Sequence, residues 1–338
     1  MNKRERNQQI EGLRGIACLL VVFHHIIWSF NYNFLDTAWA VKISKYAGLG
    51  RFGVIVFLII STWFMVDCPW VPTESVFKET YKQLKIKIEK LYQKLWLAYL
   101  PYVLSITVIY AVTRGATKID LAVSLKTYFL NLTMLAGIIP HVNYVDGAHW
   151  YIATLIYLTI VVTVIEKLFK GNSYIYILWI LGSFAVKGYL PSSLRDFTGI
   201  IVIVIMERKI LSCAASLKYR IPIIIAIVVS GLYTVYFQGV FFTILFVISN
   251  IIFLLAVNNK LSVLSAKGIV WFGELSLYLY LIHQKISYVI EFYTMEIVNK
   301  YWVQFVAYIV AFIVSLMLAL LIRKTVTSIQ RVVTITKK

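Results

Sequence analysis

The fold is decided first by the stretch EGLRGIACLLVVFHHII, residues 11–27, in which one arginine and two histidines interrupt an apolar run. Arg14 and His25 are eleven positions apart. On a helix they therefore share a face to within about 20° and lie about 16 Å apart along its axis, while His24 points about 80° away. Ionisable side chains at membrane depth usually face a polar cavity. We therefore predict a functional site on this helix; the alternative is an interfacial anchor at Arg14 and a structural histidine at His25.

The whole chain has the composition of a membrane protein. It has 338 residues, of which 60% are hydrophobic, and its apolar runs recur at lengths near twenty residues. Its mean hydropathy is +0.80. These values predict an all-α polytopic membrane protein rather than a soluble one. The first apolar run has no small-residue cleavage site, so we expect it to be a retained span rather than a signal peptide. We expect residues 1–338 to form a single transmembrane domain with no additional soluble domain.

Ten transmembrane helices are predicted from the apolar runs. They cover approximately residues 13–30, 47–66, 91–110, 149–165, 174–190, 196–210, 221–237, 240–257, 270–290 and 302–322. Residues 73–90 alternate lysines with apolar residues, a pattern typical of a helix on the bilayer surface. The outer segment 111–147 contains an apolar stretch, 119–139, which we expect to lie at the interface or re-enter it, because a further span there would invert every later loop.

The net charge of +18 is explained by membrane orientation. The basic residues are spread between the apolar runs and do not form one patch, so we predict no nucleic-acid partner. With the N-terminus inside, the cytoplasmic segments carry most of the lysines and arginines, as the positive-inside rule requires. Both termini are therefore predicted to be cytoplasmic.

Disulfide and metal sites are not expected. Cys18, Cys68 and Cys213 have no paired spacing, and we interpret them as packing residues. His25, His149 and His283 lie on three separate spans without a carboxylate at ligand spacing, so we predict no metal.

The remaining ionisable residues fall into two layers. Arg14, Lys90 and Lys94 lie near the inner face, where cations suit a phosphate or another anion that arrives from the cytoplasm. The alternative for both lysines is simple compliance with the positive-inside rule. His25, His149 and His283 can approach one another in the outer half, where a histidine can act as a general base.

The span 270–290 carries a polar stripe. Ser276, Tyr280 and His283 stand at positions i, i+4 and i+7, so they share a face that can line the same cavity. Such a stripe is also an ordinary device for packing helices in membranes. Both interpretations stay open on the sequence.

Four segments together give the chain a family resemblance. They are LRGIA at 13–17 followed by His25, RFGVIVFLIISTWF at 51–64, HWYI at 149–152 and LSLYLYLIHQ at 275–284. Their order and separation resemble those of the acyltransferase-3 family of integral membrane acyltransferases, over nearly the whole chain. The second segment departs from the family pattern at Thr62, where glycine is usual.

The resemblance implies an O-acetyltransferase, an enzyme that transfers groups other than aminoacyl groups. The acetyl group would come from cytoplasmic acetyl-CoA and go to a hydroxyl of an exported or cell-envelope polysaccharide. Arg14 would hold or polarise the donor, and His25 would deprotonate the acceptor. Lys90 and Lys94 have the spacing of the family's basic pair for the CoA phosphates, although lysine lacks the bidentate geometry of the usual arginine.

The same resemblance implies a multi-pass protein of the bacterial cytoplasmic membrane, working with a carbohydrate acceptor and with possible polysaccharide-assembly partners. We expect five residues to bind substrate: His149, Trp150, Ser276, Tyr280 and His283. Two other functions stay open on the sequence. One is a transporter or flippase for a glycan or small anion, and the other is a scaffold without catalytic activity.

Overall fold

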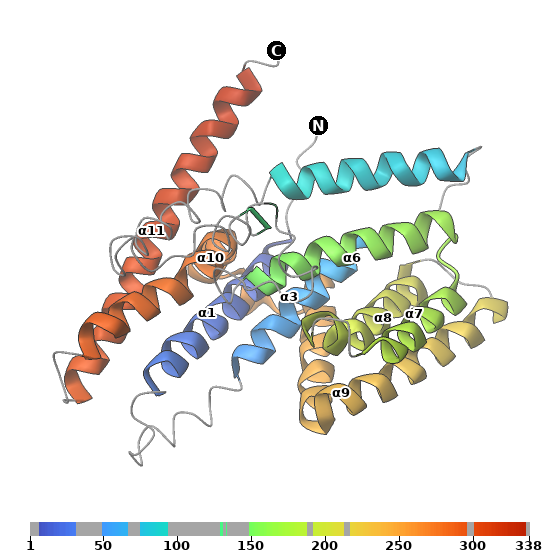
Figure 1. Ribbon diagram of the computed structural model, residues 1–338, viewed down its shortest axis with the longest axis horizontal. Helices are drawn as coiled ribbons and strands as arrows, with labels where there is room; N and C mark the ends of the chain where they lie inside the picture. Colours follow the sequence, from blue (N-terminus) through green and yellow to red (C-terminus); the bar gives the residue numbers. More distant parts are fainter. Residues whose placement is uncertain are drawn as a thin grey trace.

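The computed structural model describes residues 7–31, 49–66, 75–93, 129–130, 133, 149–187, 192–212, 217–295 and 301–335. Within these ranges the regular elements are helices and no strand occurs, so the predicted all-α class is confirmed there (Figure 1). The helices are α1 (Gln8–Asn31), α3 (Leu49–Met65), an unlabelled helix at 76–93, α6 (His149–Leu168), α7 (Ser173–Ala185), α8 (Ser192–Ser212), α9 (Leu217–Val257), the short 3₁₀ helix η3 (Ser262–Ser265), α10 (Lys267–Met295) and α11 (Tyr301–Ile335).

Four helical stretches of the described chain are long and apolar enough to cross a membrane: Gln8–Ile26, Trp150–Leu168, Ile221–Val257 and Val306–Ile329. The third of them contains a break at Gly239, whose φ of 79° and ψ of 167° are not helical. This break separates the two predicted spans 221–237 and 240–257. The predicted span 91–110 lies outside the described residues beyond position 93, as does most of 111–147. The count of ten spans and the cytoplasmic termini therefore stay predictions.

Helix α1 lies between α3 and α10 (Figure 1). Its contacts with α10 advance in the same direction along both helices, from Glu11 beside Gly273 to His25 beside His283, so the two helices are parallel. Its contacts with α3 run in opposite directions, with Ala17 beside Gly53 and His24 beside Gly50. Most of the face of α1 that carries its chemistry is thus covered by protein.

Glycines bring α1 and α10 together backbone to backbone. A Cβ atom at Gly273 would overlap the carbonyl of Glu11, and one at Gly15 would overlap the carbonyl of Ile269. Small residues that permit close approach are a common basis of helix packing in membranes, where the hydrophobic effect does not drive helices together. Cys18 belongs to the same seam: it is buried, and its Sγ lies 3.5 Å from the carbonyl oxygen of Ser276. The predicted packing role is confirmed for Cys18; Cys68 and Cys213 lie outside the described residues.

The helices α7, α8 and α9 form a group beside α3, on the side away from α11 (Figure 1). Trp63 of α3 packs edge to face on Phe253 of α9, with ring centroids 5.2 Å apart. Buried polar contacts connect α6 to α7 and α8. The carboxylate of Glu166 accepts a hydrogen bond from the Tyr176 hydroxyl at 2.6 Å and forms an ion pair with Lys209 at 2.8 Å. This group holds α3 and α6 in the positions from which they contribute to the site.

The helix at 76–93 was predicted, as 73–90, from its alternating lysines, and its helical character is confirmed. The side chain of Lys87 ties this helix to α3, because its Nζ donates to the carbonyl oxygen of Met65 at 3.2 Å. Leu91 lies one turn further along, so it shares the Lys87 face. That face is turned toward the site described next.

Candidate active site

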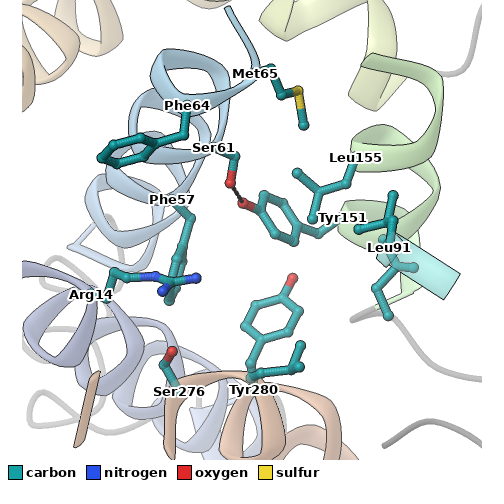
Figure 2. Close-up of a pocket in the computed structure, with 12 residues that line it drawn as sticks. Arg14, Phe57, Ser61, Phe64, Met65, Leu91, Tyr151, Leu155, Ser276 and Tyr280 are labelled. Carbon is teal, nitrogen blue, oxygen red and sulfur yellow. Dashed lines mark hydrogen bonds between the residues drawn. The ribbon is translucent and has the colours of Figure 1, made fainter. Parts of the chain in front are cut away.

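A cavity of about 240 Å³ lies between α1, α3, α6 and α10 and is completed by Leu91 (Figure 2). We call it the Arg14 pocket. Its polar lining residues are Arg14, Ser61, Tyr151, Ser276 and Tyr280, and its apolar lining residues are Phe57, Phe64, Met65, Leu91, Ile152, Leu155 and Leu277. The pocket thus has apolar walls and a few converging polar groups, as small-molecule sites usually do.

Arg14 supplies the charge of the pocket. Its Nη1 donates to Oε1 of Glu11 at 3.2 Å, an i,i+3 ion pair on the same helix. Its buried Nε has no hydrogen-bond partner among the described residues. The guanidinium points into the pocket, toward the side on which Tyr151 and Tyr280 lie (Figure 2). A buried N–H without a partner costs about 1–3 kcal/mol, so this group is poised to donate to a ligand that enters the pocket.

Four hydroxyl groups line the Arg14 pocket. The Ser61 and Tyr151 hydroxyls are 3.1 Å apart and share a hydrogen bond across the α3–α6 contact. The Tyr280 hydroxyl points into the pocket from α10 (Figure 2), and Ser276 lies one turn before it on the same helix. The predicted stripe on α10 therefore divides: Ser276 and Tyr280 line the pocket, whereas His283 does not.

His283 instead contacts His25. Nε2 of His283 lies 3.0 Å from Nδ1 of His25, and the ring centroids are 5.0 Å apart. The predicted approach of these two histidines is confirmed. We call them the histidine pair. His283 has no exposed surface, so its ring is held firmly by the surrounding helices.

The backbone determines where the hydrogens of the pair reside. Nδ1 of His283 is 3.1 Å from the Leu279 carbonyl oxygen, and Nδ1 of His25 is 3.0 Å from that of Val21. A carbonyl oxygen only accepts, so each Nδ1 must carry the hydrogen for these bonds to form. In the neutral pair the Val21 carbonyl oxygen and Nε2 of His283 then share the single Nδ1–H of His25 as its two acceptors. The consequence is that Nε2 of His25 carries a lone pair, which is what a general base requires.

The predicted basic pair is only partly described. Lys90 is exposed on the helix at 76–93, and Lys94 lies outside the described residues. Lys87 rather than Lys90 shares a face with Leu91, which lines the pocket. Sequence reasoning did not single out Lys87, because the helical pattern alone does not say which face of this helix meets α3.

The other predicted substrate residues lie on α6. His149 is its first residue, and the His149 side chain is outside what the structure describes. Trp150 stacks on Phe197 of α8, with centroids 5.7 Å apart and planes 8° from parallel. Trp150 therefore packs between α6 and α8, and its neighbour Tyr151 is the α6 aromatic residue that lines the Arg14 pocket. Thr62 is buried beside the pocket-lining Ser61, with no hydrogen-bond partner for its hydroxyl among the described residues.

In the described part of the chain, no group of three or more histidine, cysteine or acidic residues is arranged so that it could hold a metal ion. Sequence analysis missed the pocket-lining residues of α3 and α6, among them Phe57, Ser61 and Tyr151. A signal was present for Ser61, a hydroxyl within the apolar run IISTWF, and for Glu11, which stands one turn before Arg14. Phe57 and Tyr151 gave no signal, since aromatic residues are abundant in this chain.

Comparison with protein families decides the class of the protein. The acyltransferase-3 family model, described as an acyltransferase domain, matches residues 7–324. The chain belongs to the acyltransferase-3 family. No curated protein and no solved structure matches it. The predicted resemblance is thereby confirmed, and with its apolar helices the chain is a membrane acyltransferase.

Proposed function

We propose that this acyltransferase-3 protein is an O-acetyltransferase of the bacterial cytoplasmic membrane. It takes the acetyl group from cytoplasmic acetyl-CoA and transfers it to a hydroxyl of a cell-envelope or exported polysaccharide. The bilayer, the acyl-CoA donor and the carbohydrate acceptor are its immediate partners, and proteins of polysaccharide assembly can deliver the acceptor. Family membership supports the acyl transfer; the donor, acceptor and location are our proposal.

The observation that carries the proposal is the histidine pair next to the Arg14 pocket. His25 has the lone pair of Nε2 available, and His283 fixes that tautomer through its own bond to the Leu279 carbonyl. A general base held in one tautomer by a second group is a recurrent arrangement for activating a hydroxyl. In our proposal His283 is a positioning residue, which refines the predicted substrate-binding role.

The donor binds at the other end of the site. Arg14 donates to the thioester end of the donor, using the N–H groups that Glu11 leaves available. Lys90 and Lys94 contribute positive charge for the CoA phosphates at the predicted cytoplasmic end of the same pocket, and Lys87, on the face that carries the pocket-lining Leu91, contributes the charge nearest to the pocket. Ser276 and Tyr280 line the pocket beside the donor, and His149 and Trp150 at the start of α6 serve the acceptor side.

The reaction proceeds by direct transfer between the two substrates. The acceptor hydroxyl gives its proton to Nε2 of His25 while its oxygen attacks the thioester carbonyl carbon. A new C–O ester bond forms and the C–S bond breaks. The sulfur of CoA leaves as a thiolate and takes up the proton, so that His25 is neutral again. No redox step occurs.

The test measures CoA release and label transfer from radiolabelled acetyl-CoA by the purified protein in liposomes, with extracted cell-envelope glycans as acceptors. We expect His25→Ala to lower label transfer by about 10²- to 10⁴-fold, the usual contribution of a general base. The matched control is His24→Ala, which changes the adjacent histidine that packs against Gly50 and should retain most of the transfer.

Full transfer by folded His25→Ala protein would overturn the catalytic assignment. Movement of a glycan across the liposome membrane without CoA release would overturn the proposed reaction and favour the transporter. Labelling of a lipid or protein instead of a glycan would keep the acyltransferase and replace the acceptor.

A further inference from the structure

We propose that Phe57, Tyr151 and Tyr280 form a three-ring layer that determines the length of the acyl group this enzyme transfers, and that it selects acetyl over longer groups. The inference rests on the proposed function, because it concerns the donor of that reaction. It assigns the choice of acyl group to three residues, of which Phe57 and Tyr151 had no predicted role. The argument follows from where the Arg14 pocket ends.

The pocket has a direction along its helices. On α3 its lining runs from Met65 back to Phe57, and on α10 it runs from Ser276 forward to Tyr280. Because α1 is parallel to α10 and antiparallel to α3, Met65 and Ser276 lie toward one end of the pocket, and Phe57 and Tyr280 lie toward the other. On α6 the lining residues run from Leu155 back to Tyr151, which shares a hydrogen bond with Ser61. The three rings are thus the last lining residues on their helices, at the end away from Met65.

The three rings are in mutual contact. The centroid distances are 6.0 Å between Phe57 and Tyr151, 6.0 Å between Phe57 and Tyr280, and 5.6 Å between Tyr151 and Tyr280. Aromatic pairs in contact have centroids about 4.5–7 Å apart, so no gap separates the three rings from one another. All three side chains are buried. A group larger than the pocket therefore has to displace at least one ring.

The layer separates the two chemical ends of the site. The Tyr280 ring contacts the His283 ring, with centroids 5.7 Å apart, and His283 contacts His25. Neither histidine lines the pocket. A donor that enters past Met65 with its acyl group leading presents that group to the three rings. The rings come from α3, α6 and α10, so the acceptor oxygen, activated by His25, reaches the carbonyl along the fourth side of the pocket, where α1 carries both Arg14 and His25.

The three rings therefore limit the length of the acyl group that fits in the pocket. An acetyl group ends in one methyl, whereas each further methylene has to be accommodated against rings that already touch. One methylene too many in an apolar pocket typically changes selectivity about 10- to 200-fold. The apolar residues further out, such as Phe64 and Leu155, contact the part of the donor that all acyl-CoA molecules share.

The experiment compares acetyl-, propionyl-, butyryl- and hexanoyl-CoA as donors, by CoA release in liposomes with one glycan acceptor. The readout is the ratio of kcat/KM for butyryl-CoA to that for acetyl-CoA. We expect the wild type to favour acetyl-CoA at least about tenfold, and Phe57→Ala to raise the ratio at least about tenfold. Phe64→Ala is the matched control: it makes the same change on the same helix, at a residue that is 60% exposed, and should leave the ratio unchanged.

Two additional variants keep the test decisive. Phe57→Leu keeps an apolar side chain if Phe57→Ala fails to fold, and should raise the ratio in the same direction. Tyr280→Phe removes a hydroxyl but keeps the ring, so it should leave the ratio unchanged whatever it does to the rate.

Acetyl transfer with a butyryl ratio that neither Phe57 variant changes would overturn the three-ring layer alone. Equal use of hexanoyl- and acetyl-CoA by the wild type would also overturn it. Absence of CoA release with every donor would overturn the proposed function, and the inference with it.

Discussion

The two ends of the site on α1 differ in how tightly they are held. At the pocket end, Arg14 is 30% exposed and its bonds to described residues leave Nε without a partner. At the histidine end, His283 is fully buried and both rings of the pair are bonded to backbone carbonyls. A group that receives a mobile substrate keeps spare hydrogen-bonding capacity, whereas a base that needs one tautomer has its other nitrogen occupied. Both ends depend on the same α1–α10 seam.

The largest effect is expected from disrupting the α1–α10 seam. Both ends of the site depend on this contact, so its loss should destabilise both. Gly15→Val places a branched side chain against the Ile269 carbonyl and the Gly273 backbone. Backbone contacts cannot move away as a flexible side chain can, so we expect a loss of about 3 kcal/mol or more. Thermal unfolding in detergent measures it. Gly182→Ala, at a glycine with nothing within 4 Å of an added Cβ, should be neutral or slightly stabilising; an equal loss in both variants would contradict the seam.

The second prediction affects the histidine end alone. His283→Leu removes one of the two acceptors for Nδ1–H of His25 and the ring that positions it, so the Val21 carbonyl alone holds the tautomer; we expect kcat to fall about 10- to 100-fold with donor KM unchanged. His283→Gln can offer a side-chain carbonyl to the same hydrogen and should recover part of kcat. Steady-state kinetics with acetyl-CoA give both parameters.

A merely structural role for His283 would make the leucine and glutamine variants equally slow. The pH profile of kcat provides an independent readout. It should move in His283→Leu, because the group bonded to the base has changed.

The third prediction affects the pocket end alone. Arg14→Lys keeps the positive charge but loses the planar fork that serves Glu11 and the ligand at once. We expect donor KM to rise about tenfold while the pH profile of kcat stays as in the wild type. Isothermal titration with a non-hydrolysable acetyl-CoA analogue measures the binding directly. Unchanged affinity would place the donor elsewhere.

The smallest effect is expected at the rim of the pocket. Lys87 lies against Met65 at 3.2 Å, whereas Lys90 is exposed on the same helix. Exposed charges contribute about 0.2–1 kcal/mol, so Lys87→Gln should raise donor KM by about two- to fivefold, and Lys90→Gln by less. The measurement is donor KM at low and high salt. The opposite ranking would put the CoA phosphates on the exposed face of this helix, where the sequence predicts Lys90 to act.

Sequence analysis predicted the helices and the polar residues on α1 because both depend on local spacing. The eleven-residue interval between Arg14 and His25, and the histidine on a late span, pointed to a site before any tertiary contact was known. His25 and His283 meet because α1 and α10 pack in parallel, which places these two positions side by side.

The pocket itself depends on information that spacing does not contain. Which residues of α3 and α6 face Arg14 is determined by how those helices pack on α1 and α8. The Ser61 hydroxyl stands out in its apolar run, but its spacing does not place it at Arg14, and Tyr151 gave no signal. The same holds for the helix at 76–93, where the Lys87 contact with Met65 fixes the rotation. The spacing of Ser276, Tyr280 and His283 predicted one face that can line a single cavity. In the structure Ser276 and Tyr280 line the pocket, whereas His283 lies beyond the three-ring layer.

The α1–α10 seam has a consequence for the synthesis of this protein. His25 and His283 are separated by 258 positions, so the ribosome works for about 13 to 50 seconds, at 5–20 residues per second, between making the first histidine and the second. During that interval α1 has entered the bilayer without α10, its principal neighbour. The early intermediate must therefore shield Arg14 and His25 with lipid headgroups, water or a membrane insertase, and catalytic competence arises only as the last helices arrive.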